Sequence, residues 1–174
     1  MAKWRRVRGR TLDRGAAAVE FALVVLPLLL LVMGILDYGR FFFDSVSLRQ
    51  GAREAARQAV VQRYGASCAG TVGVGAKIAC SAKAASDMTI GTPVVYIPAV
   101  TEDVVGNGTQ GKQLLVCMQS YEQGTGLVPL PGHGIIKTET YMSIEDASLI
   151  VNAYEDPAPT DSNGVVSSWT PWCS

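Results

Sequence analysis

The sequence predicts an α+β protein in which a long N-terminal transmembrane helix extends into a small, disulfide-stapled antiparallel β-sheet domain. Three observations predict this class. An apolar run of 21 residues, from Ala16 to Leu36, contains a single ionisable residue. A helical pattern continues beyond that run, and short strand patterns separated by turn-rich segments follow it. The 174 residues therefore suggest one small domain attached to a separate helix.

Residues 1–15 form a basic leader. They hold six basic residues and one acid, a net charge of +5, and the remaining chain carries the opposite net charge. Beside an apolar run, such residues indicate membrane orientation and lipid contact more than nucleic-acid binding. Only Arg40, Arg49 and Arg53 lie within about 17 residues after the run. We therefore expect a cytoplasmic N-terminus and an extracytoplasmic C-terminal domain in a single-pass protein of the cell membrane.

Residues 16–36 are predicted to be the transmembrane helix, because about 20 apolar residues in a helix span a bilayer. A secretory signal peptide would have a shorter apolar core and a small-residue cleavage site, whereas "DYGRFFF" follows here. A buried core helix is the alternative, but too little chain remains to cover all its faces. Pro27 predicts a kink, since it leaves the carbonyl of Leu23 without its donor.

Residues 37–64 are predicted to extend this helix, giving a helix from about Ala16 to Arg63, roughly 72 Å long, with Gly65 as its stop. Apolar or small residues recur on one side: Tyr38, Phe41, Phe42, Ser45, Val46, Ala52, Ala55, Ala56, Ala59 and Val60. The other side is polar: Arg40, Asp44, Arg53, Glu54, Arg57 and Gln58. The row formed by Arg49, Arg53 and Arg57 indicates either a solvated face or a contact with an acidic partner or lipid head groups.

Residues 65–156 are predicted to form the small α+β domain, and residues 157–174 an irregular tail. A short helix is expected at about 76–85, and strands at 93–97, 112–121 and 135–145. In the last strand we expect Ile136, Thr138, Thr140, Met142 and Ile144 on one face, and Lys137, Glu139, Tyr141 and Glu145 on the other.

The four cysteines, Cys68, Cys80, Cys117 and Cys173, all lie in the predicted extracytoplasmic part, and no pair has C-x-x-C spacing. Two disulfides are therefore expected. Of the three possible pairings we favour Cys68–Cys80, which closes a local loop, with Cys117–Cys173, which anchors the tail.

No catalytic motif is found, so the sequence indicates neither an enzyme nor a cofactor or metal site. The single histidine, His133, lies in a "PGHG" segment that favours an exposed loop. No partner for catalysis accompanies it in that motif.

The segment "RG–AAAVE–FALVVLPLLLLVMGILDYGR" resembles the start of TadE-like proteins, the minor pilins or pseudopilins of Tad (Flp-type) pili, within the type IV class. The resemblance covers residues 10–64 well and residues 112–146 loosely. It implies cleavage by a prepilin peptidase between Gly15 and Ala16, which makes Glu20 the fifth residue of the processed chain. It also implies partners: other pilin subunits and Tad assembly proteins beside the lipid bilayer, with a location in the pilus after processing.

Glu20 fits such an assembly role on physical grounds. A carboxylate deep in a transmembrane helix costs about 2.5–3.5 kcal/mol and usually has a partner. Cleavage would free the α-amine of Ala16, and a neighbouring subunit's amine could pair with Glu20; alternatively, Glu20 lies near enough to the interface to stay hydrated. The leading hypothesis is a TadE-like minor pilin or pilus-assembly protein that packs through its helix. A membrane-anchored exported binding protein is the alternative.

Overall fold

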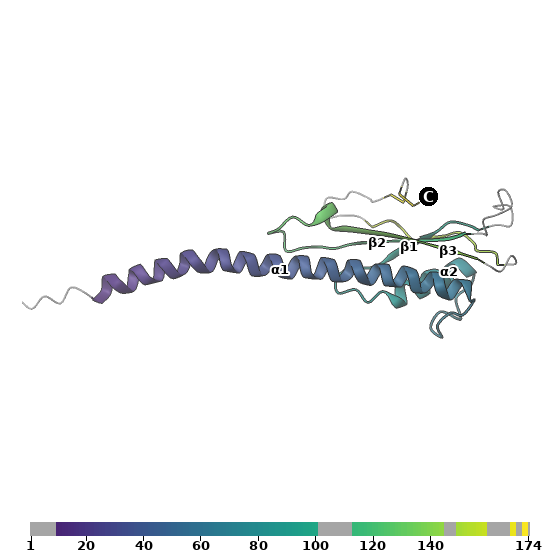
Figure 1. Ribbon diagram of the computed structural model, residues 1–174, viewed down its shortest axis with the longest axis horizontal. Helices are drawn as coiled ribbons and strands as arrows, with labels where there is room; N and C mark the ends of the chain where they lie inside the picture. Colours follow the sequence, from purple (N-terminus) through teal and green to yellow (C-terminus); the bar gives the residue numbers. More distant parts are fainter. Residues whose placement is uncertain (1–9, 101–112, 145–148, 160–167, 170–171, 174) are drawn as a thin grey trace, which may run out of the picture.

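The computed structural model describes residues 10–100, 113–144, 149–159, 168–169 and 172–173. Its elements are α1 (Arg10–Val60), α2 (Val74–Ala85), β1 (Val94–Ile97), β2 (Gln113–Tyr121), a short 3-10 turn (Pro131–Gly134), β3 (Ile135–Ser143) and β4 (Tyr154–Glu155). Figure 1 shows α1 as a long rod with the small sheet domain packed along its C-terminal part only. The predicted fold class is confirmed: a long N-terminal apolar helix, a small antiparallel sheet and two disulfides.

Helix α1 is longer at its start and shorter at its end than expected. It begins at Arg10, six residues before the predicted start, and continues through Pro27 with only a gentle curve in Figure 1. It ends at Val60, because Gln62 adopts a left-handed φ of 53°. The Gln62 amide then donates to the Ala59 carbonyl at 3.1 Å, and the Arg63 amide donates to the Gln58 carbonyl at 3.0 Å. This pair of bonds satisfies carbonyls at the end of the helix, so Gly65 is not the stop.

The faces of α1 differ from the prediction at three positions. Asp44 was assigned to the polar side, yet it is fully buried, whereas Phe42 and Val46 are more than half exposed. The buried stripe contains Asp37, Asp44, Leu48, Ala52, Ala55 and Ala59. Its spacing is close to the 3.6-residue helical period. Two acids lie within this stripe because the domain provides hydrogen-bond donors to both, which a periodicity of apolar residues does not reveal.

The sheet has four antiparallel strands in the order β3-β2-β1-β4. The three predicted strands are found, and β2 pairs along its whole length with β3, in a register that places Met118 opposite Thr138. The alternation predicted for β3 holds, since Ile136 and Thr138 are buried while Lys137 and Glu139 are exposed; Glu145 lies outside the described residues. The short β4 was not predicted, because two residues carry no readable periodicity.

Both faces of β2 are covered, which makes the domain three-layered. Leu114, Val116 and Met118 face a main core formed with α1 and α2. Leu115 and Cys117 face a smaller core on the other side, formed with Trp169 and Cys173 of the C-terminal tail. The described residues of the tail form no helix or strand, and Trp169 and Cys173 contribute to a third layer.

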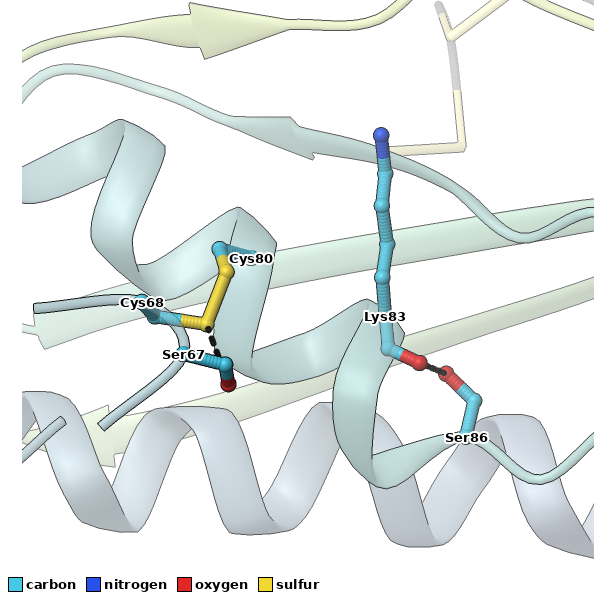
Figure 2. The surroundings of a disulfide bond; sticks show 5 residues. All are labelled: Ser67, Cys68, Cys80, Lys83 and Ser86. Atoms are coloured by element: carbon cyan, nitrogen blue, oxygen red, sulfur yellow. Dashed lines mark hydrogen bonds between the residues drawn. A yellow bond between two sulfur atoms is a disulfide. The ribbon is translucent and has the colours of Figure 1, made fainter. Parts of the chain in front are cut away.

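Helices α1 and α2 pack closely through small residues. A side chain on Gly51 would place its Cβ 2.7 Å from the Ala82 carbonyl oxygen, so only glycine allows this approach. The Cys68–Cys80 disulfide joins the loop after α1 to α2, as Figure 2 shows. In the same view the Lys83 side chain extends away from α1, consistent with its 2.7 Å ion pair with Asp156. The second disulfide, Cys117–Cys173, ties the tail to β2. The favoured pairing is therefore the one in the structure.

Candidate functional site

The first part of α1 exposes a long apolar surface. We call residues 15–36 the helical arm; they extend beyond the domain in Figure 1. Large apolar side chains point outward all round it, with Phe21 70% and Leu23 71% exposed. Among the described residues, α1 is the one helix long and apolar enough to cross a membrane. A helix that is apolar on every side and uncovered needs lipid or other helices around it.

The predicted assembly residues lie on successive turns at the start of the arm. Gly15, Ala16 and Glu20 are all exposed and helical, and a Cβ at Gly15 would meet nothing within 4 Å. Pro27 lies near the middle of the arm. No hydrogen bond or ion pair to Glu20 is present among the described residues, so within one subunit its carboxylate has no partner there.

A polar junction fixes the domain to the base of the arm. Asp37, only 5% exposed, accepts hydrogen bonds from the Thr125 hydroxyl at 2.6 Å and from the Thr125 amide at 3.2 Å. One residue on, the Tyr38 hydroxyl donates to the Pro129 carbonyl at 3.0 Å. Both partners lie in the segment between β2 and β3. The arm therefore leaves the domain at a defined residue.

Two turns further along α1, Asp44 makes the second half of the junction. Its carboxylate accepts hydrogen bonds from the Thr89 amide at 2.8 Å and from the Thr89 hydroxyl at 3.0 and 2.9 Å. The Ile90 amide donates more weakly, at 3.4 Å. Such bonds compensate for burying a charge, because a carboxylate without donors would be strongly penalised.

Glu122, at the end of β2, faces the same place from the sheet. It is 3% exposed, and burial raises the pKa of its carboxyl to about 8, with further upward contributions from hydrogen bonding to Asp44 and from the Asp44 charge. The Gly91 amide opposes the shift. At neutral pH the protonated Glu122 can thus donate a hydrogen bond to the Asp44 side chain. Gly91 has no room for a side chain, since a Cβ there would collide with Glu122 and Ser120.

The sequence patterns did not predict this junction. Asp37 and Asp44 are seven residues apart, a spacing that places both on one helix face. That spacing is the only sequence signal for the junction. No local pattern indicates the role of Glu122, because its contact with α1 depends on the tertiary fold.

An apolar groove of about 270 Å³ lies at the base of the arm. It is lined by Ile35, Leu36, Gly39, Arg40, Phe43 and Thr89. The apolar surface of the arm therefore extends, through this groove, to the part of α1 that packs against the domain. A neighbouring helix could therefore pack along α1 beyond the arm.

The described residues offer no metal centre, since no group of three or more histidine, cysteine, aspartate or glutamate side chains could hold an ion. His133 is exposed and occupies the 3-10 turn before β3 with a left-handed φ of 55°. It borders an open cavity of about 430 Å³ formed by the β2–β3 connection. The histidine has the exposed loop position that the sequence favours.

Comparison with known proteins identifies the N-terminal region. Residues 15–57 match the family model described as TadE-like protein, which confirms the resemblance of the arm and the helix that continues it. No curated protein and no solved structure matches the chain. The matched range begins at Gly15 and ends within the part of α1 that packs against the domain.

Proposed function

From the match to TadE-like proteins over residues 15–57, we propose that this chain is a TadE-like minor pilin or pilus-assembly protein of a Tad-type pilus. The family match supports the coarser statement, a role associated with the Tad pilus. The finer proposal is that the chain is anchored in the membrane by the helical arm, with the leader in the cytoplasm and the domain outside. It assembles by packing that arm against the arms of other subunits.

The observation that carries the proposal is the arm itself. It presents about six turns of largely uncovered apolar helix with one acid, Glu20, on the turn after the Gly15–Ala16 bond. A helix that served only as an anchor would gain from having no acid at all, because the carboxylate makes insertion less favourable. An acid at this position is explained by a partner, and cleavage after Gly15 would generate one as the α-amine of Ala16.

The polar junction supports the same proposal mechanically. Asp37 and Asp44 hold the domain against α1 over two turns. We therefore expect the domain and the arm to move as one rigid body. Packing of neighbouring arms would then set the spacing and direction of the domains. A membrane-anchored binding protein would need no such fixed angle between its anchor and its domain.

The test of the proposal is processing of the leader. Protein purified from membranes of cells that contain the prepilin peptidase is analysed by intact-mass spectrometry. We expect a chain that begins at Ala16 in wild type and an accumulated full-length chain in Gly15→Leu, because the larger side chain does not fit a small-residue cleavage site.

Gly39→Leu serves as the matched control, since Gly39 is also an exposed helical glycine with nothing within 4 Å of its Cβ position. It should be processed like wild type. An uncut wild-type chain in the presence of an active peptidase would refute the prepilin assignment and leave the anchored binding protein as the better account.

A further inference from the structure

A groove of about 320 Å³ runs between α1 and the outer strand of the sheet. It is lined by Arg49, Arg53, Lys137, Thr138, Glu139 and Thr140. The strand order places β3 at one edge, and among the described residues only β2 pairs with it. In the described part of the chain no further strand lies on the outer side of β3. An exposed edge of this kind can accept a further strand.

The charges of the groove are unbalanced. Arg49 and Arg53 are exposed one helical turn apart, and neither makes a hydrogen bond or ion pair with a described residue. Arg57, the next arginine in the row, donates hydrogen bonds of 2.8 and 2.9 Å to the Glu54 carboxylate. The α1 side of the groove therefore carries two positive charges available to a ligand.

The opposite wall, on the other face of β3, is close to neutral. There Lys137 lies over the Trp172 ring, 5.3 Å from its centre, and exposed Glu139 follows two residues later. A ligand strand lying along the edge would thus meet positive charge on the α1 face and balanced charge on the other face. Acidic side chains are favoured on one face of that strand only.

The spacing of the two arginines matches that of a strand. Residues four apart on a helix are separated by about 6 Å along the axis, and alternate residues of a strand by about 6.7 Å. Figure 1 shows β3 running along α1. Acids at positions i and i+2 of an added strand would therefore lie opposite Arg49 and Arg53.

We propose that this groove binds an extended acidic segment of another protein, with carboxylates at alternate positions, which adds to the edge of β3 as a further strand. The segment is not supplied by a second copy, because no two acidic residues of the 174 are two positions apart. Pairing of β3 with β3 of a second copy would also bring the two Arg49–Arg53 pairs together, and like charges repel.

Lipid head groups are a poorer occupant. Arg49 lies 13 residues beyond Leu36, the end of the apolar run. That separation is roughly 20 Å along α1, about twice the Debye length at physiological ionic strength. The inference does not depend on whether the leader is cleaved or the chain enters a pilus.

The test uses the full-length protein in nanodiscs of neutral lipid and a synthetic nine-residue peptide, capped at both ends, of alternating threonine and glutamate. The control peptide has the same composition with its glutamates in one block. Isothermal titration calorimetry should show binding of the alternating peptide and at least about tenfold weaker binding of the block peptide, because the block cannot place its carboxylates on one face.

Variants locate the site. The double variant Arg49→Gln, Arg53→Gln should bind the alternating peptide about tenfold more weakly than wild type does. The matched control, Arg57→Gln, should leave binding unchanged, because Arg57 is held by Glu54. Hydrogen exchange should slow at amides of β3 when the alternating peptide is bound, a signature that charge attraction alone would not give.

Several results would overturn the proposal. Equal affinity for both peptides, or unchanged exchange in β3, would exclude strand addition. Absence of binding would exclude the site. Stronger binding of vesicles rich in phosphatidylglycerol, or of inorganic phosphate, through the same two arginines would identify a phosphate-bearing occupant instead of a protein segment.

Discussion

Loss of the Glu122 proton should make the domain less stable as the pH rises, and Glu122→Gln should remove this dependence. The pKa of Glu122 is raised from 4.5 to about 8 in the folded protein, with burial as the largest cause and Asp44 as the next. Between those two values the folded state holds a proton that the unfolded state has lost. The stabilisation from this group is therefore fully present below the unfolded pKa and is lost as the pH rises through the folded one.

The expected slope approaches about 1.4 kcal/mol per pH unit, and the change between pH 5 and pH 8 is about 3.5 kcal/mol, because Glu122 is half titrated at pH 8. Asp37 and Arg40 of α1 line the same small space as Glu122, and Asp44 is the acid whose charge raises the pKa of Glu122 further. Glu54, whose pKa is lowered to about 2 by its hydrogen bond with Arg57, changes stability only at more acid pH. The amide introduced by Glu122→Gln stays neutral and can still donate to Asp44, so the variant should equal wild type at pH 5 and exceed it at pH 8.

The assay is urea unfolding of the full-length protein in detergent micelles, followed by fluorescence of Trp169 and Trp172, at pH values from 5 to 9. The difference between wild type and variant cancels the contributions of other groups. Glu139→Gln, which removes an exposed acid from β3, is the matched control and should leave the slope unchanged. If wild type and Glu122→Gln lose stability in parallel with pH, the buried acid pair is not protonated as described.

Two further predictions concern packing and the disulfides. Gly51→Ala should destabilise the domain by about 1–3 kcal/mol, because its Cβ would lie 2.7 Å from the Ala82 carbonyl oxygen. Gly39→Ala, where a Cβ meets nothing within 4 Å, should be neutral or slightly stabilising. Chemical unfolding of both variants measures the two effects. Replacing both cysteines of the Cys117–Cys173 pair by alanine should cost about 4 kcal/mol on loop-closure arguments. Removal of the other disulfide should cost about 3 kcal/mol because its loop is shorter. Equal losses for the two disulfides, or a greater effect of Gly39→Ala than of Gly51→Ala, would contradict the respective arguments.

Much of the fold was readable from the sequence because its signals are local. The apolar run predicted the arm, and the two-residue alternation at Ile136 and Thr138 predicted β3. The favoured cysteine pairing, in which one bridge closes a local loop and the other anchors the tail, is the one present in the structure. The end of α1 was missed because a left-handed residue is expected to be glycine, and here Gln62 adopts that conformation.

The polar junction was less predictable. Asp44 was placed on the polar side because the helical pattern groups it there, and its partners, Thr89 and Glu122, are 45 and 78 residues away in the chain. The role of Trp169 in a second core was missed for the same reason. Long-range pairing of polar groups has no period in the sequence, so only the assembled structure reveals it.

We propose above all that Glu20 serves assembly and not insertion, and one parallel measurement on Glu20→Leu tests this. In cells that carry the pilus genes, membrane-inserted protein and crosslinked complexes between neighbouring arms are quantified together in wild type and variant. The variant helix is more apolar, so insertion should be equal or better. Complexes should be lost, because the partner's N-terminal amine would be buried without a counter-charge. Complexes at wild-type levels in Glu20→Leu would contradict the account and leave Glu20 as a hydrated residue at the edge of the membrane.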